Sequence, residues 1–249
     1  MIRDIAVLIP AHNEEKAIGG LVAELKGKYK TVVVVNDGSS DKTALCAGDS
    51  GAVVLTHPVC RGKGEALKTG FAYLAKQDVD AVITMDGDGQ HTVEDAANFE
   101  RAYRRNKSVC MWVGKRKIKG TEMPFIRRLT NISMSLAISM LSFQWIPDTQ
   151  NGFRLIKREV IEKIRLCTSH FETESELLIK CGWRGYRISS VKISTVYASE
   201  KSKINPYTDT MRFFLMLLII IFPLFARITE CRKKLILKRC GKEWLKPRL

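Results

Sequence analysis

The sequence has no CxxC pair, no GxGxxG or GxxxxGK[ST] loop, and no zinc-finger spacing. These absences exclude a zinc finger, a Rossmann dinucleotide site and a P-loop enzyme. The seven cysteines are scattered, which is typical of thiols that pack as small apolar side chains in a reducing compartment. Because the first four residues lead straight into a strand-like segment, we expect no signal peptide and a cytosolic catalytic part.

Acidic residues are few relative to basic ones: 26 against 41, which gives a net charge of +15. Such an excess predicts an anionic partner. Residues 227–249 hold nine basic and two acidic residues beside the most apolar stretch of the chain. This arrangement favours an anionic membrane surface. Nothing resembles an RNA-binding aromatic motif or a bZIP heptad, so we expect no nucleic-acid partner.

Five apolar, β-branched runs alternate with amphipathic stretches in the first half of the chain. This pattern predicts an α/β fold with a mostly parallel central sheet and helices on both faces. The predicted strands are Ile5–Ile9, Thr31–Val35, Ala52–Thr56, Ala81–Met85 and Val109–Val113, and the predicted helices lie near 14–27, 41–49, 64–76 and 92–105. The second half predicts helices over 125–143 and 173–182 and one or two strands over 186–197.

We expect a catalytic domain over 1–205 and a C-terminal membrane-associating helical extension over 206–249. The extension contains Phe213–Ala226, fourteen residues without a charge, which as a helix would span about 21 Å. This is short of the roughly 30 Å hydrocarbon core of a bilayer. With the basic residues that follow, the segment predicts a helix lying in the membrane interface. A core or oligomer helix and a true span remain open alternatives.

Polar motifs follow three of the predicted strands directly. They are Pro10-Ala11-His12-Asn13-Glu14-Glu15, Asn36-Asp37-Gly38-Ser39-Ser40-Asp41 and Asp86-Gly87-Asp88-Gly89-Gln90-His91. In open α/β sheets the ligand crevice lies outside the carboxyl ends of the strands. The three motifs are therefore predicted to converge on one site.

Asp86 and Asp88 are two carboxylates at the end of a predicted buried strand. Such neighbours repel unless a cation lies between them or one is protonated. Hard oxygen ligands suit Mg²⁺ or Mn²⁺, and Mg²⁺ is commonly held by one or two carboxylates and substrate phosphates. An EF-hand is excluded, because His91 and Ala97 stand where that loop needs glycine and glutamate. A solvated turn with incidental acids remains the alternative.

Two further segments are candidates for ligand binding. Asp37 is suited to accept hydrogen bonds from a nucleobase or ribose, although the following Ser-Ser-Asp also predicts a helix cap. Residues 61–64, Arg-Gly-Lys-Gly, resemble a phosphate cradle before a helix start.

Together these motifs resemble the family 2 glycosyltransferases with a GT-A fold. The downstream segments Asp148-Thr149-Gln150-Asn151-Gly152-Phe153-Arg154, Phe171-Glu172-Thr173-Glu174 and Ser202-Lys203-Ile204 resemble the branch that transfers mannose or glucose to dolichyl or polyprenyl phosphate. The resemblance covers about residues 4–205. It implies a nucleotide-sugar donor, a divalent metal, Mg²⁺ or Mn²⁺, and a polyprenyl-phosphate acceptor at the cytoplasmic membrane face.

The resemblance also implies roles for individual residues. Nucleotide-sugar binding is expected at Pro10, Ala11, Asn13, Glu14, Asp37, Gly62, Lys63, Asp86, Gly87, Asp88 and Gln90, with Asp86, Asp88 and Gln90 at the metal. Acceptor phosphate is expected at Arg116, Arg128, Asn131 and Arg154. Asp88, Asp148 and Lys203 are the expected catalytic residues. For each cation, Lys203 included, the alternative is a solvated surface charge. Residues 127–131 depart from the serine-bearing pattern of that branch.

The chemistry expected is inverting attack on the anomeric carbon, which displaces a nucleoside diphosphate. A lipid phosphate is already anionic near neutral pH and needs no strong general base. A hydroxyl acceptor would need one, for which Asp148 is the first candidate and Glu174 the second. That family 2 reaction is the nearest rival. A sugar nucleotidyltransferase would need a glycine-rich, basic loop after the first strand, where this chain has Pro10-Ala11-His12-Asn13-Glu14. A non-catalytic membrane or nucleic-acid binder would leave the three acidic motifs unexplained.

Overall fold

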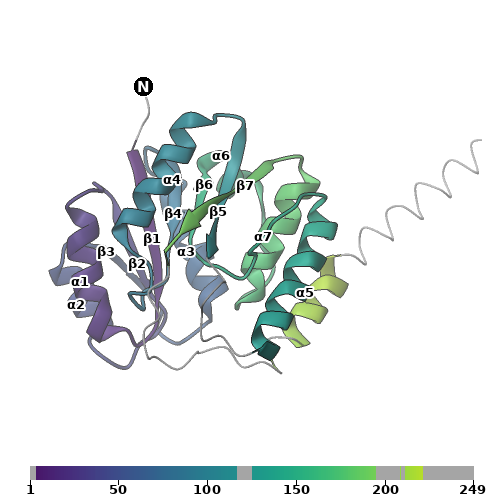
Figure 1. Cartoon of the computed structure of the whole chain (residues 1–249). Helices are drawn as coiled ribbons and strands as arrows, with labels where there is room; N and C mark the ends of the chain where they lie inside the picture. The colour runs from purple at the N-terminus through teal and green to yellow at the C-terminus, as the bar shows by residue number, and fades with distance from the viewer. Residues whose placement is uncertain (1–3, 117–124, 195–207, 209–210, 221–249) are drawn as a thin grey trace, which may run out of the picture. The chain divides into compact units, whose positions relative to one another are not determined.

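The computed structural model describes residues 4–116, 125–194, 208 and 211–220, with the backbone alone for 125–129. Up to residue 194 the described residues form seven strands and seven helices (Figure 1). The strands are β1 Asp4–Ala11, β2 Val32–Asn36, β3 Val53–Thr56, β4 Val79–Thr84, β5 Val109–Arg116, β6 Arg154–Lys157 and β7 Arg187–Ile193. The helices are α1 Glu15–Lys26, α2 Thr43–Asp49, α3 Lys63–Leu74, α4 Val93–Arg105, α5 Phe125–Ser142, α6 Arg158–Lys163 and α7 Glu172–Trp183.

The strands form one sheet in the order β3-β2-β1-β4-β6-β5-β7. Strands β1 to β4 pair in parallel, and β5 pairs in parallel with β7. The expected α/β fold with a mostly parallel sheet is confirmed. The exception is β6, which the sequence did not predict and which runs antiparallel to both β4 and β5.

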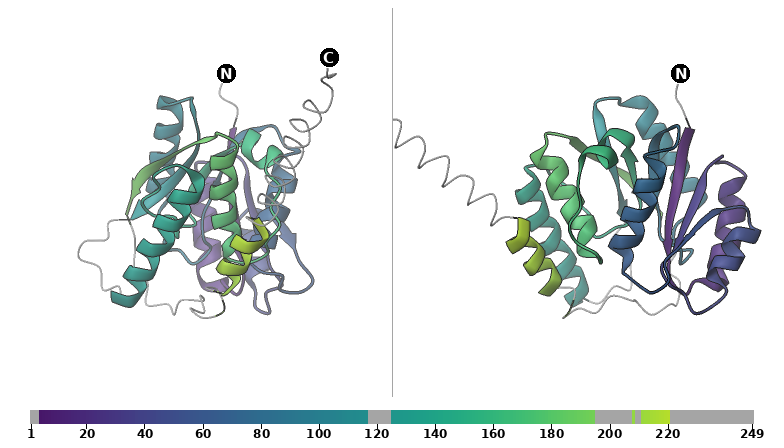
Figure 2. Two further views of the ribbon diagram at one scale, coloured as in Figure 1. Left: turned by 90° about the vertical axis from the view of Figure 1, so that its right-hand side faces the viewer. Right: turned by 180° about the vertical axis from the view of Figure 1, so that it is seen from behind.

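Helices cover both faces of the sheet (Figure 2). On one face, α1 and α4 bury Ile18, Leu25 and Phe99 against the strands, in the cluster that also contains Trp112. On the other face, α3 approaches β1 so closely that a Cβ on Gly70 would lie 2.2 Å from the Leu8 side chain. Helices α6 and α7 pack beside α3. The parallel strands therefore have a helix layer on each side, and their carboxyl ends are left to carry polar residues.

Local sequence explains where these elements begin and end. Strand β2 is a run of four buried valines followed by Asn36, and β-branched residues suit a strand covered on both faces. Helix α4 starts where the Thr92 hydroxyl accepts a hydrogen bond from the main-chain nitrogen of Asp95. It ends with Arg104 and Arg105, which complement the negative end of the helix dipole.

The chain forms two compact units, Met1–Lys201 and Ser202–Leu249. In the second unit, residues 211–220 are helical. Among the described residues, no helix combines the length and apolar character needed to cross a bilayer. Residues 201–207 and 221–226 lie outside the described residues. The domain boundary expected at residue 205 and the interfacial helix expected to extend to residue 226 therefore stay predictions.

Candidate active site

The motifs after β1 and β2 are bonded to each other. The main-chain nitrogen of Asp37 donates to the Ala11 carbonyl at 2.8 Å. Asn13 adopts a left-handed conformation with φ of 54°, which asparagine tolerates better than most residues. In that conformation its side-chain oxygen accepts from the Ser40 nitrogen at 2.9 Å, and its own main-chain nitrogen donates to the Ser39 hydroxyl at 3.0 Å.

The motif after β4 joins the same region. A Cβ on Gly87 would lie 3.4 Å from the Cβ of Ala11 and 3.5 Å from the Cγ of Glu14. The main-chain nitrogen of Glu14 is in turn held by the Thr43 hydroxyl at the start of α2. The three motifs thus lie side by side at the carboxyl ends of β1, β2 and β4, as their positions in the sequence predict.

Asp37 organises the loop that precedes α3. Its Oδ1 accepts from His57 Nδ1 at 2.7 Å and from the Arg61 nitrogen at 2.9 Å. Its Oδ2 accepts from the Gly62 nitrogen at 2.7 Å and from the Cys60 thiol at 3.4 Å. Burial alone raises the pKa of Asp37, but these hydrogen bonds lower it below its ordinary value. The carboxylate shapes the wall of the site through this loop.

An ion cluster lies where the loop meets the motif after β4. Lys63 Nζ, at the start of α3, is 2.6 Å from Asp86 Oδ1 and 3.1 Å from Glu174 Oε2. Burial opposes the charge on Lys63, yet the two carboxylates raise its pKa. Burial likewise opposes the charge on Asp86, while the Lys63 ammonium holds the pKa of Asp86 far below its usual range. One lysine therefore pairs with two carboxylates from different elements, and Arg154 Nη2 lies 3.9 Å from the second of them, Glu174 Oε1.

Gly152 lies against this cluster. A Cβ on Gly152 would lie 2.7 Å from Lys63 Nζ and 3.0 Å from both Asp86 Oδ1 and Glu174 Oε1. Thr84 fixes the glycine by donating its hydroxyl to the Gly152 carbonyl at 2.9 Å. The bare backbone here leaves the three charged groups room to meet.

Asp88 differs from Asp86 in its surroundings. Its Oδ1 accepts a hydrogen bond from the main-chain nitrogen of Gln90 at 3.0 Å. Burial is the largest cause that raises the pKa of Asp88 above its ordinary value, and the negative charge of Asp86 raises it further. A carboxylate whose charge is opposed in this way is suited to a divalent cation, and oxygen donors are the ligands that Mg²⁺ and Mn²⁺ prefer. Asp88, Asp86 and the Gln90 amide thus fit such an ion chemically.

The buried Asp148 forms an ion pair with the partly exposed Arg116 beside the end of β5. Arg116 donates through Nε at 2.8 Å and through Nη2 at 2.9 Å, one bond to each oxygen of the carboxylate. The main-chain nitrogen of Arg116 adds a third bond at 3.2 Å. Such a fork fixes the guanidinium in one orientation. Asp148 is thus placed to orient an arginine.

Arg154 has a structural role inside the fold. Its side chain is 1% exposed and donates to the carbonyls of Asn151, Glu174 and Thr149 at 2.8 to 3.0 Å. These bonds tie the loop before β6 to helix α7. This role could not be predicted from the sequence, because the hydrogen-bond acceptors are main-chain carbonyls, one of them twenty residues away.

Other expected site residues lie in or near the same region. Pro10 and Ala11 end β1, with Ala11 buried. Asn131 is half-buried on α5. The side chain of Arg128 and all of Lys203 lie outside the described residues.

His57 was not predicted as a site residue, and neither was His91. His57 bridges Asp37 and the Thr69 hydroxyl, which is 2.9 Å from Nε2. His91 lies 3.7 Å from Asp86 Oδ2 through its Nε2. A signal existed only for His91, which belongs to the motif after β4, whereas His57 reaches the site through the fold alone.

Glu176 on α7 is a buried carboxylate that holds the segment before this helix. Fully buried, it accepts hydrogen bonds from the nitrogens of Cys167 and Thr168, from the Thr168 hydroxyl and from Lys180. Burial alone raises its pKa, but the bonds from Lys180 and Thr168 lower it below the ordinary value of 4.5.

We expect Glu176→Gln to lower the free energy of unfolding by about 2–3 kcal/mol at pH 7, because an amide N–H replaces one of two fully used acceptors. A lowered pKa contributes stability above pH 4.5, which is lost as the pH falls toward the folded-state value. The variant should therefore lose less stability than the wild type below pH 4.5. Urea titrations at several pH values measure both effects. Glu162→Gln, which removes an exposed i,i+4 pair with Arg158, is the control and should change stability by less than about 0.5 kcal/mol.

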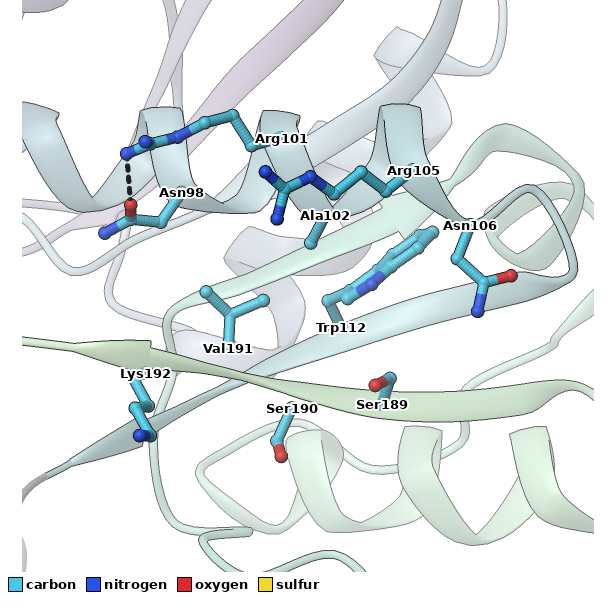
Figure 3. Close-up of a pocket in the computed structure, with 10 residues that line it drawn as sticks. All are labelled: Asn98, Arg101, Ala102, Arg105, Asn106, Trp112, Ser189, Ser190, Val191 and Lys192. Carbon is cyan, nitrogen blue, oxygen red and sulfur yellow. Dashed lines mark hydrogen bonds between the residues drawn. The ribbon is translucent and has the colours of Figure 1, made fainter.

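A separate hollow of about 590 Å³ lies between α4, β5 and β7 (Figure 3). It contains the edge of Trp112 and the cations Arg101, Arg105 and Lys192. Among the described residues that line it there is no carboxylate. The three motifs at the carboxyl ends of β1, β2 and β4, together with Lys63 and Glu174, form what we call the strand-end cluster. This cluster is the candidate active site.

Comparison with known proteins identifies the family. The sequence model of the family described as glycosyl transferase family 2 matches residues 6–165. A dolichyl-phosphate hexose transferase of Haloferax volcanii is 32% identical over 82% of this chain and 88% of its own length. A UDP-N-acetylglucosamine–dolichyl-phosphate N-acetylglucosaminyltransferase of Methanococcus voltae is 28% identical over 78% of this chain and 86% of its own.

Among solved structures, glucosyl-3-phosphoglycerate synthase of Mycobacterium tuberculosis, in complex with Mn²⁺, uridine diphosphate and phosphoglyceric acid, superposes with a TM-score of 0.69. It is 20% identical, and the match covers 87% of this chain and 78% of that one. This likeness shows the fold, which is the expected GT-A fold. The chain is a glycosyltransferase and belongs to glycosyl transferase family 2.

Proposed function

We propose that the protein transfers a hexose, with inversion, from a UDP- or GDP-linked sugar to a polyprenyl or dolichyl phosphate. The observation that carries the lipid-phosphate acceptor is the similarity to dolichyl-phosphate hexose transferases along most of their length. The strand-end cluster supplies the donor side of the proposal, because its cation and carboxylates suit a diphosphate and its metal.

On the donor side, the motifs after β1 and β2 form the proposed nucleoside site. The residues assigned to it are Pro10, Ala11, Asn13, Glu14 and Asp37, with Gly62, Lys63 and Gly87 toward the diphosphate. Asp86, Asp88 and Gln90 would hold the divalent metal. When bound, such an ion neutralises charge on the leaving diphosphate. The Mn²⁺ and Mg²⁺ complexes of the mycobacterial synthase support a metal of this kind.

In the proposed step, an acceptor phosphate oxygen forms a bond to the anomeric carbon while the bond from that carbon to the donor's β-phosphate oxygen breaks. The electron pair leaves with the nucleoside diphosphate. In this proposal Lys63 exchanges a carboxylate partner for a diphosphate oxygen, and Lys203, which lies outside the described residues, is assigned the same role. Cations beside the leaving group stabilise the negative charge that develops on it.

On the acceptor side, Arg116 is the proposed phosphate ligand, oriented by Asp148. Arg128 and Asn131 are proposed beside it. We leave Arg154 out of this set, because its guanidinium is buried and bonded to carbonyls.

The rival, a hydroxyl acceptor, needs a general base. Both candidates for that base are engaged with cations, Asp148 with Arg116 and Glu174 with Lys63. Neither carboxylate can turn toward an acceptor hydroxyl without breaking its ion pair. This favours an acceptor that arrives already ionised, as a phosphate monoester does.

We further propose that the protein attaches peripherally to the cytoplasmic face of the membrane through its C-terminal segment. The helix over 211–220 exposes apolar side chains at helical spacing: Met211, Phe214, Leu215, Leu218 and Ile219 are each at least half exposed. The basic residues of 227–249 follow it in the sequence. An exposed apolar face followed by basic residues suits an anionic bilayer surface.

The test is a transfer assay with Mg²⁺ or Mn²⁺, a panel of labelled UDP- and GDP-sugars, and a polyprenyl phosphate. We expect label in the lipid phase that depends on both the metal and the lipid. Label found only in a water-soluble product would favour the hydroxyl acceptor, and no transfer from any donor would contradict the proposal.

A further inference from the structure

His91 is a buried histidine with one nitrogen left unpaired. The residue is 8% exposed, and its ring packs against Phe153 with centroids 4.7 Å apart. Phe153 packs in the same way against Phe99. Among the described residues, nothing hydrogen-bonds His91 Nδ1, and that atom is closed to solvent.

An unpaired buried nitrogen lowers the stability of the fold, because it has lost its hydrogen bonds to water and gained none in return. Phenylalanine fits an aromatic environment of this kind without that cost. Packing therefore does not account for a histidine at this position, and the reason is to be sought at the other edge of the ring.

That edge faces Asp86. His91 Nε2 is 3.7 Å from Oδ2, whereas Lys63 Nζ is 2.6 Å from Oδ1. The two oxygens of one carboxylate thus lie near two different nitrogens. At 3.7 Å the histidine contact is longer than a hydrogen bond, and a shift of about 0.5 Å would close it.

We propose that His91 is a positioning residue for the donor diphosphate and its metal. Its Nε2–H, in the tautomer with Nδ1 unprotonated, limits the rotation of the Asp86 carboxylate and keeps Oδ2 directed into the site. This inference rests on the proposed role of Asp86 toward the metal. Groups that orient metal-binding side chains typically change metal affinity 10- to 100-fold when removed.

Two substitutions separate positioning from packing. His91→Phe keeps an aromatic ring and removes both nitrogens, so the melting temperature is expected to stay level or rise while Mn²⁺ affinity falls at least about tenfold. His91→Gln loses the ring but restores an N–H near the position of Nε2. Its melting temperature is expected to fall, while Mn²⁺ affinity stays within about threefold of the wild type, a small loss beside that expected for His91→Phe.

The measurement is calorimetric titration of the full-length protein with Mn²⁺ in the presence of saturating UDP, repeated with GDP, beside thermal unfolding of each variant. A residue that serves packing alone predicts the reverse: wild-type affinity in His91→Phe and a loss in His91→Gln. Wild-type affinity in His91→Phe overturns the inference, and so does an equal loss in both variants. If the wild type itself binds no Mn²⁺ with either nucleotide, the proposed metal role of Asp86 fails, and this inference fails with it.

Discussion

Asp88→Asn is expected to lower metal-dependent sugar transfer at least about a hundredfold while the fold stays intact. Removing one group that stabilises charge at the transition state typically costs a factor of 10² to 10³ in kcat. The asparagine oxygen can still accept the hydrogen bond from the Gln90 nitrogen. Burial and Asp86 already oppose the charge on Asp88, so its loss should leave the melting temperature level or slightly raised.

Transfer rates across a Mn²⁺ titration, with thermal unfolding of the same samples, measure this effect. Asp49→Asn is the matched control, since that aspartate is exposed at the end of α2. It should change neither property. Unchanged turnover and unchanged metal dependence in Asp88→Asn would contradict the assignment of Asp88 to the metal.

Gly152→Ala is expected to lower the transfer rate by about 10- to 100-fold at saturating donor. The new methyl group would lie 2.7 Å from Lys63 Nζ and 3.0 Å from Asp86 Oδ1, so the lysine must move away from its carboxylates. A misplacement of about 1 Å in a catalytic arrangement is enough for a hundredfold loss. The displaced charges should also lower the melting temperature.

Gly20→Ala is the control for that substitution. Gly20 lies inside α1, and a Cβ there meets nothing within 4 Å. Alanine is favoured over glycine in a helix interior by about 1 kcal/mol, so this variant should be more stable and equally active. A Gly152→Ala variant with the wild-type rate would show that the Lys63 cluster does not take part in transfer.

Much of the fold was predictable because strand and helix patterns reflect local burial. Strands β1 to β5 and helices α1 to α5 and α7 lie within a few residues of the expected ranges. Strand β6 was not predicted, because its sequence Arg-Leu-Ile-Lys is too short to show a strand pattern. Its antiparallel pairing with β4 could not be predicted either, since four residues carry no signal for strand direction. The short helix α6 follows it directly and gave no separate signal.

The site was predictable where the topology alone brings motifs together. Parallel strands place their carboxyl ends at one edge of the sheet, so the motifs containing Glu14, Asp37 and Asp86 had to meet. The Lys63–Glu174 contact was not predictable, because it joins residues 111 positions apart through the packing of α3 on α7. For the same reason, the sequence could not show that Asp37 is engaged by His57.

The central claim, inverting transfer to a lipid phosphate, is tested most directly by NMR of the product made from a donor labelled with ¹³C at the anomeric carbon. The account predicts an anomeric carbon that couples to a single phosphorus and has the configuration opposite to that in the donor. An anomeric carbon without phosphorus coupling, or one with the donor's configuration retained, would contradict it.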